Sequence, residues 1–349
     1  MMNYQVDSFA WELTMACNMR CRHCASACGA AQPDQLTTEE ALKFCRDVAA
    51  LKPRRASLVG GEPLLREDWP LIAKELSTRG IQVDIVTNGA LLCRETAETM
   101  RESGIGLVSL SIDGPPDIHN AVRGNDCYDQ CAQAYEHINR AGMHAAANTT
   151  VLKENIDTLE EMRENLIRHG VKDWQLQSGV PYGNLCEHRE SVIVPQDLDR
   201  LINFAYEANL KGGLRVHLAD GIGYYTRKET AARQMAMETS QLVVWGGCHA
   251  GINAFGLLHN GDVTGCVSIR DGRFIEGNIR ARSIRDIWED ETAFAWRRRF
   301  DHTKLTAPCA DCEYAGLCLG GCVSARLAFC GDLYNGNVYC VYAGQCNKR

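Results

Sequence analysis

Residues 14–24 read TMACNMRCRHC and directly follow a short apolar run, FAWEL, at residues 9–13. The stretch places Cys17, Cys21 and Cys24 in a C-x3-C-x2-C spacing. Three thiolates on one tight loop can hold three irons of a [4Fe–4S] cluster, which leaves the fourth iron without a protein ligand. An iron with an open position can chelate a small molecule through an amine and a carboxylate, as a catalytic zinc keeps one position for its substrate.

Zinc is an alternative occupant of the same loop. Cys28 extends the run to C-x3-C-x2-C-x3-C, and a structural zinc site uses four protein ligands. Close cysteines can also arise by chance in a chain that contains 18 of them. The loop by itself leaves these alternatives open.

The composition is that of a globular protein, with 45% hydrophobic and 23% charged residues over 349 positions. The net charge is −7 and the three arginines at 297–299 are the longest basic stretch, so nothing indicates nucleic-acid binding. The N-terminus lacks a signal-peptide pattern, and the chain lacks an apolar run of about 18 residues. We therefore expect a cytoplasmic protein without membrane contact, in which clustered thiols bind metal more often than they form disulfides.

Strand-like and helix-like segments alternate through the first 180 residues. After the strand at 9–13, strands are expected at 56–59, 83–87, 107–112, 145–152 and 174–177, with helices at 37–51, 69–79, 95–103, 128–141 and 159–169. This alternation predicts parallel βαβ units and an α/β fold, a partial (β/α)6 TIM-like barrel whose chemistry lies at the C-terminal ends of its strands. Residues 215–219 are expected to add an edge strand, and residues 194–210 a helix that bridges the domains.

The second expected strand ends in the sequence GGEP at residues 60–63. Gly60 and Gly61 allow a close backbone approach to a ligand, and Glu62 offers a carboxylate that could pair with an ammonium group. A simple strand-to-loop turn would explain the four residues equally well if they stood alone. Their position after the cysteine loop and at a strand end favours a binding site.

Together, the cysteine loop and GGEP resemble the radical S-adenosylmethionine (SAM) enzymes. In that family the open iron binds the amine and carboxylate of SAM, and an electron from the cluster splits the sulfonium to a 5′-deoxyadenosyl radical that abstracts hydrogen. The resemblance implies that Glu62 binds the amine of SAM, that Ser111 and Arg123 lie near its carboxylate, and that the backbone of His23 approaches the adenine. The implied cofactor contacts are thus Gly60, Gly61, Glu62, Ser111, Arg123 and His23.

A second group of cysteines fills the C-terminal third of the chain. Cys248 and Cys266 flank Asn260-Gly261, a strong hairpin signal that would bring the two thiols together. Cys309, Cys312, Cys318 and Cys322 follow in a C-x2-C-x5-C-x3-C spacing, with Cys340 further on. A structural zinc site is the alternative for the four closely spaced cysteines.

These seven cysteines resemble the SPASM domain, a small cysteine-rich domain with a β-hairpin and helices that carries two auxiliary iron–sulfur clusters. By that resemblance, Cys309, Cys312, Cys318 and Cys340 hold the outer cluster, and Cys248, Cys266 and Cys322 hold the inner one. Ala254 stands where some relatives have a further ligand, so the inner cluster has an open iron or recruits Cys330 or Cys346; we favour a protein thiol. Val267 replaces the base of sulfatase-maturing relatives and argues against that activity.

The resemblance implies a radical SAM barrel at 1–220, a bridging segment at 221–242 and a SPASM domain at 243–349, with SAM and three [4Fe–4S] clusters. The expected function is the modification of a ribosomally made peptide by a crosslink or another side-chain change. Alternatives are a small-molecule enzyme acting, for instance, on a tetrapyrrole carboxylate, a peptide epimerase, and a zinc-binding scaffold without catalysis. Expected partners are the peptide, a separate leader-peptide recognition protein, and an electron donor such as flavodoxin or ferredoxin.

Overall fold

A single curved sheet organises the chain, and the computed structural model describes residues 4–346 of it. Among these residues, ten strands pair in the order β10-β9-β8-β1-β2-β3-β4-β5-β6-β7. The strands are β1 (Ser8–Glu12), β2 (Arg55–Val59), β3 (Gln82–Thr87), β4 (Ile105–Ser111), β5 (His144–Val151), β6 (Asp173–Ser178), β7 (Arg215–Leu218), β8 (Ala254–Leu257), β9 (Asp262–Thr264) and β10 (Ile275–Asn278). Strands β1 to β7 are parallel, which confirms the predicted partial barrel.

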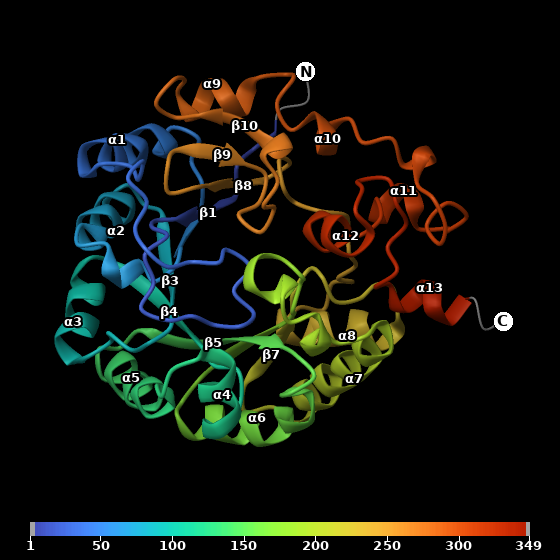
Figure 1. Cartoon of the computed structure of the whole chain (residues 1–349), viewed down its shortest axis with the longest axis horizontal. Helices are drawn as coiled ribbons and strands as arrows, with labels where there is room; N and C mark the ends of the chain where they lie inside the picture. Colours follow the sequence, from blue (N-terminus) through green and yellow to red (C-terminus); the bar gives the residue numbers. More distant parts are fainter. Residues whose placement is uncertain (1–3, 347–349) are drawn as a thin grey trace.

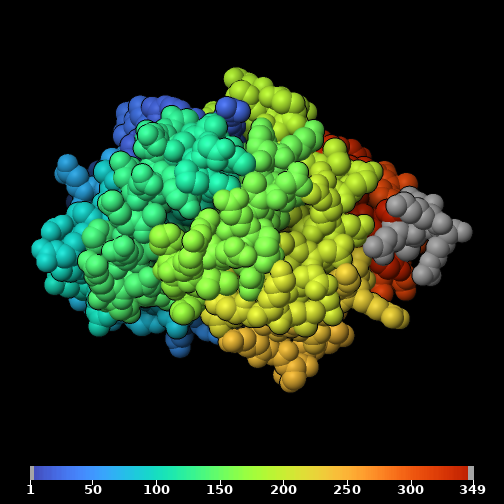
Figure 2. Space-filling view, turned by 90° about the horizontal axis from the view of Figure 1, so that it is seen from below, coloured from blue at the N-terminus to red at the C-terminus, as the bar shows by residue number. Residues whose placement is uncertain are grey.

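Helices surround the curved sheet on its outer side (Figure 1). The barrel helices are α1 (Thr38–Ala49), α2 (Trp69–Thr78), α3 (Arg94–Glu102), α4 (Pro116–Arg123), α5 (Tyr128–Arg140), α6 (Leu159–Arg168), α7 (Pro195–Lys211) and α8 (Arg227–Ala236). The later helices are short: α9 (Ile284–Glu289), α10 (Ala295–Arg298), α11 (Ala315–Cys318), α12 (Val323–Cys330) and α13 (Val341–Cys346). On the face shown in Figure 2, the green and yellow segments that include α5, α6 and α7 form a continuous surface. None of the helices between residues 4 and 346 has the length and hydropathy to cross a bilayer.

Most expected elements lie within two residues of their predicted bounds, and the hydrogen bonds explain why. The side chain of Thr37 accepts from the backbone of Glu40, and the Glu40 carboxylate accepts from the backbone of Thr37, so α1 begins with a capping box. Helix α4 was not expected, because its Pro-Pro start resembles a loop; Pro116 instead occupies the first turn, where its missing N–H costs nothing.

The C-terminal hairpin extends the barrel sheet, a pairing that the sequence did not predict. Strands β8 and β9 are antiparallel around Asn260-Gly261 as expected, but β8 also pairs in parallel with β1. The ring of Phe255 on β8 stacks on that of Phe9 on β1, with centroids 5.3 Å apart and an interplanar angle of 7°. The two cysteine-rich parts of the chain are therefore joined through one hydrophobic core that contains both rings.

Replacing Phe255 by Ala is expected to lower the free energy of unfolding by about 3–5 kcal/mol, since a fully buried aromatic ring would be lost from this core. Urea denaturation followed by circular dichroism measures the change. Leu242→Ala is the matched control, because Leu242 is 71% exposed and its loss should change stability by no more than about 0.5 kcal/mol. Equal stability of the two variants would contradict a stabilising contact between Phe255 on β8 and Phe9 on β1.

Candidate active site

The loop that carries Cys17, Cys21 and Cys24 follows β1 and is tied down at both ends. The backbone N–H of Cys17 donates to the carbonyl of Gly29 (2.9 Å). On the far side of the loop, Asn184 donates from its side chain to the carbonyl of Cys21 (2.9 Å) and from its backbone to that of Cys24 (3.0 Å). Sequence reasoning missed Asn184, because an Asn after a strand is too common to signal a contact with a loop 160 residues away.

Gly60 and Gly61 approach the cysteine loop rather than an open ligand space. A Cβ atom at Gly61 would lie 2.3 Å from the carbonyl oxygen of Ala16, and one at Gly60 would lie 2.7 Å from that of Thr14. The backbone N–H groups of Gly61 and Glu62 donate to those same two carbonyls, at 2.7 and 2.8 Å. The two glycines therefore let the GGEP turn lie directly against the chain that enters the cysteine loop.

The Glu62 carboxylate is fully buried at this turn. Oε1 accepts from the hydroxyl of Thr87 (2.7 Å) and the backbone of Leu64 (3.2 Å), and Oε2 accepts from the backbone of Asn88 (2.8 Å). Burial raises the pKa of Glu62, although these three donors oppose the shift. A carboxylate has about four acceptor positions, so one on Oε2 is left for a further donor such as an ammonium group.

A buried charge cluster lies at the ends of β4 and α4. The Arg123 guanidinium contacts the Asp113 carboxylate (2.7 Å), and Nε2 of His23 lies 3.4 Å from the same oxygen. Burial opposes ionisation of Asp113, but Arg123 and the neighbouring histidines offset it and hold its pKa below the usual range. Ser111 ends β4 two residues before Asp113. The sequence expected only the backbone of His23 to matter, whereas its side chain belongs to this cluster.

In this cluster, the Nε donor of Arg123 has no hydrogen-bond partner among residues 4–346. Arg123 also lies beside the cysteine loop, with Nη1 4.0 Å from the sulfur of Cys21. Buried donors without partners are uncommon in folded proteins. A ligand carboxylate at this position would accept from Arg123, which fits the SAM site that the sequence predicts.

Cys28 is buried beneath the same loop, with its sulfur 3.9 Å from that of Met15. Its thiol donates to the sulfur of Cys24, which lowers the pKa of Cys24 to about 6. Hydrogen bonds to ligating sulfurs are one of the factors that set the potential of an iron–sulfur cluster. The geometry therefore gives Cys28 a supporting position next to the predicted ligands.

The predicted outer thiols converge in the C-terminal region. Cys309, Cys312, Cys318 and Cys340 line one small cavity of about 20 Å³. The backbone N–H of Asn337 donates to the sulfur of Cys309 (3.3 Å), a contact that would stabilise a ligating thiolate. Four cysteines around one small cavity could provide a full ligand set for a cluster.

The predicted inner thiols Cys248, Cys266 and Cys322 line a much larger cavity of about 460 Å³. Gln175, Gln177, Ser178, His217 and Asp220 line the opposite side, at the C-terminal ends of β6 and β7. Cys330 does not line this cavity, and the side chain of Cys346 lies outside the described residues. The described residues therefore give the inner site three thiols that face open space.

A second cavity, of about 520 Å³, lies inside the barrel and shares Gln175 and His217 with the first. Nε2 of His217 lies 2.6 Å from a carboxylate oxygen of Asp173, which fixes the ring. The space that the inner thiols face thus continues into a polar barrel interior.

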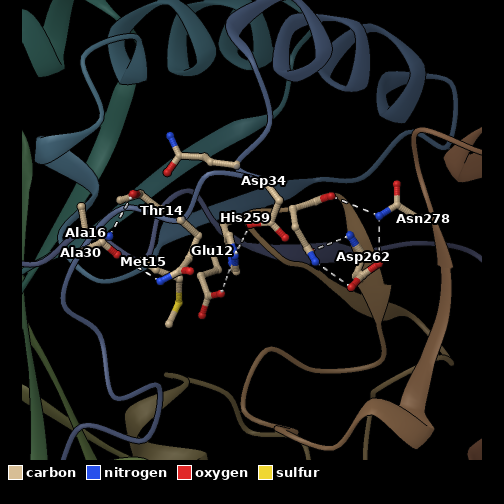
Figure 3. Close-up of polar contacts among 12 residues, drawn as sticks. Glu12, Thr14, Met15, Ala16, Ala30, Asp34, His259, Asp262 and Asn278 are labelled. Atoms are coloured by element: carbon tan, nitrogen blue, oxygen red, sulfur yellow. Dashed lines mark hydrogen bonds and ion pairs between the residues drawn. The ribbon is translucent and has the colours of Figure 1, made fainter.

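The two halves of the chain meet at Glu12, the last residue of β1 (Figure 3). One carboxylate oxygen lies 3.1 Å from Nδ1 of His259 in the hairpin, and the other lies 2.6 Å from the guanidinium of Arg270. Burial opposes ionisation of Glu12, but these partners offset it and lower its pKa. Sequence reasoning missed Glu12 because it stands inside an apolar run.

Comparison with known proteins agrees with this geometry. The sequence profile of the radical SAM superfamily matches residues 11–166, and that of the SPASM iron–sulfur cluster-binding domain matches residues 248–313. An AdoMet-dependent heme synthase of Methanosarcina barkeri is 30% identical over 341 residues, which cover 95% of both chains. The chain belongs to the radical SAM superfamily. As a radical SAM enzyme with a SPASM domain it binds SAM and [4Fe–4S] clusters, and the zinc-scaffold alternative is wrong.

Two further relatives show how widely this architecture is used. The mycofactocin maturase MftC of Mycolicibacterium smegmatis is 25% identical over 319 residues, which cover 90% of this chain and 78% of that protein. The crystal structure of SuiB from Streptococcus suis bound to S-adenosylmethionine superposes with a TM-score of 0.74 at 17% identity, over 97% of this chain and 78% of that one. SuiB shares the fold of this radical SAM enzyme.

Gly61→Ala is expected to remove about four irons per chain, one [4Fe–4S] cluster, because the new methyl group would collide with the Ala16 carbonyl and displace the cysteine loop. Iron and acid-labile sulfide in the anaerobically reconstituted protein measure the loss. Gly106→Ala is the control, since nothing lies within 4 Å of the added carbon. A Gly61→Ala variant with full iron content would refute the contact between GGEP and the loop.

Proposed function

We propose that this radical SAM enzyme acts on a carboxylate side chain of a tetrapyrrole. The observation that carries the proposal is the 30% identity to a heme synthase that extends over 95% of both chains. The alignment with the mycofactocin maturase is weaker and leaves more of that relative uncovered. The proposal replaces the peptide that the sequence first suggested with the small-molecule alternative.

In this proposal, bound SAM and the cluster together supply hydrogen-atom abstraction from the substrate. The free acceptor position on Glu62 receives the ammonium group of SAM, a charge-assisted contact in a dry site. Arg123, with Ser111 at the end of β4, holds the carboxylate. The glycines at 60 and 61 orient these groups by keeping the GGEP turn against the cysteine loop.

The substrate occupies the 460 Å³ cavity between the ends of β6 and β7 and the inner thiols. Gln175, Gln177 and Ser178 offer amide and hydroxyl donors for a substrate carboxylate, and His217 adds a ring held by Asp173. The neighbouring 520 Å³ cavity provides room for the rest of a macrocycle. Cys248, Cys266 and Cys322, on the other side of this cavity, would hold the inner cluster, which would supply an electron acceptor.

Peptide modification is the second candidate, and one feature of the cavity favours it. Cys248, Cys266 and Cys322 are joined by no fourth cysteine among the described lining residues. An iron left open there would accept a cysteine thiolate of a peptide. In either case an electron donor such as flavodoxin or ferredoxin would reduce the SAM cluster, and three clusters are expected.

The test uses the reconstituted enzyme with SAM and a reductant under anaerobic conditions. We expect an iron porphyrin with propionate side chains to stimulate 5′-deoxyadenosine formation and to lose CO2, and deuterium on those side chains to appear in 5′-deoxyadenosine. Mass spectrometry measures both products, and the porphyrin ester serves as control. Stimulation by a cysteine-containing peptide, with the porphyrin unchanged, would reverse the order of the two candidates.

A further inference from the structure

A second group of reactive side chains lies behind the SAM site, outside the ligand sets described above. His119 in α4, Cys127 before α5 and Cys131 one turn into α5 are all buried. Their nitrogen and sulfur atoms all lie within 4.8 Å of one another. Such a trio either binds a metal or forms a reactive thiol pair.

The position of the ring proton in His119, which its hydrogen bonds set, decides between these roles. The backbone N–H of Asp113 donates to Nδ1 of His119 (3.2 Å), so Nδ1 must keep its lone pair. The proton of the neutral ring is then on Nε2, which lies 3.4 Å from the sulfur of Cys127 and 3.9 Å from that of Cys131. A metal would need the lone pair on Nε2. The orientation therefore favours an N–H···S contact over a metal bond.

The same contacts activate Cys127. The neighbouring Cys131 and His119 side chains lower the pKa of Cys127 to about 5, although burial opposes the shift. Cys127 also occupies the N-cap position of α5, a 13-residue helix whose dipole favours a thiolate. The pKa of Cys131 is raised, so one thiolate and one thiol stand side by side.

We infer that Cys127 and Cys131 form an oxidisable dithiol site, which hydrogen peroxide converts to a disulfide with a loss of SAM affinity. The Cys127 thiolate attacks one peroxide oxygen and the O–O bond breaks. Cys127 becomes a sulfenic acid, and the hydroxide that leaves takes a proton from solvent to form water. The Cys131 sulfur then attacks that sulfur, the S–S bond forms as the S–O bond breaks, and the thiol proton joins the leaving hydroxyl as a second water. The thiols lose two electrons, which the peroxide accepts. Cys127 is 1% exposed and Cys131 is 0% exposed, so only an oxidant about as small as water can reach the two sulfurs.

Two hydrogen-bond chains connect the pair to the predicted SAM contacts. The Cys131 thiol donates to the carbonyl of Asn88 (3.0 Å), whose backbone N–H donates to Glu62 (2.8 Å). On the other side, His119 accepts from the backbone of Asp113, whose carboxylate pairs with Arg123. A disulfide removes the S–H that Cys131 donates to Asn88 and the thiolate of Cys127 that accepts from His119. Each hydrogen-bond chain therefore loses its contact with the cysteine pair. The effect on SAM rests on the proposed roles of Glu62 and Arg123, whereas the disulfide itself does not.

In the experiment, the holoenzyme is treated anaerobically with limiting hydrogen peroxide. Alkylation and peptide mapping then detect the disulfide, and SAM affinity is measured on samples of equal iron content. The wild type should yield a Cys127–Cys131 disulfide and bind SAM about tenfold more weakly, the equivalent of one lost hydrogen bond. Dithiothreitol should restore the affinity. Cys131→Ser keeps a donor to Asn88 and should keep its affinity, and Cys93→Ser, at an exposed site, should respond like the wild type.

Three results would overturn the inference. The first is a wild type whose two cysteines stay alkylatable at peroxide doses that lower its iron content. The second is a disulfide that leaves SAM affinity unchanged. The third is stoichiometric zinc or copper in the purified wild type that Cys127→Ser removes, which would make the trio a metal site. Peptide mapping of the wild type shows by itself whether the disulfide forms, so this part of the test does not depend on the folding of any variant.

Discussion

The pairing of the buried Glu12 carboxylate with His259 and Arg270 is the interaction on which the arrangement of the barrel and the SPASM region depends. A charge at the end of β1 must be paired, and its partners His259 and Arg270 come from the hairpin region. Strand β1 meanwhile pairs with β2 on one side and β8 on the other. The strand that leads into the SAM-cluster loop is thus the strand on which the SPASM region is built.

This shared strand brings two sets of thiols to the same end of the barrel. The loop after β1 lies against the GGEP turn of β2, and the inner thiols face the ends of β6 and β7 across a cavity. Under the proposed function, a substrate in that cavity would lie between a site that removes a hydrogen atom and a site that can accept an electron. The barrel supplies the first site, and the hairpin and α12 supply the second.

Local patterns predicted local structure well, and non-local contacts escaped prediction. The capping box at Thr37 and the hairpin at Asn260-Gly261 depend on neighbouring residues, and both were predicted. Glu12 was overlooked because its partner His259 is 247 residues away, and Asn184 because Cys21 is 163 residues away. The cysteine spacings identified the family, because ligand spacing is local to each loop, but the cavity between the loops depends on how distant strands pack.

The most direct test of the account is SAM cleavage by the reduced, reconstituted enzyme and by a variant with Cys17, Cys21 and Cys24 all replaced by Ala. We expect the wild type to form 5′-deoxyadenosine, whereas the variant should form none and should keep the iron held by its C-terminal cysteines. Continued formation of 5′-deoxyadenosine by the triple variant would contradict the account.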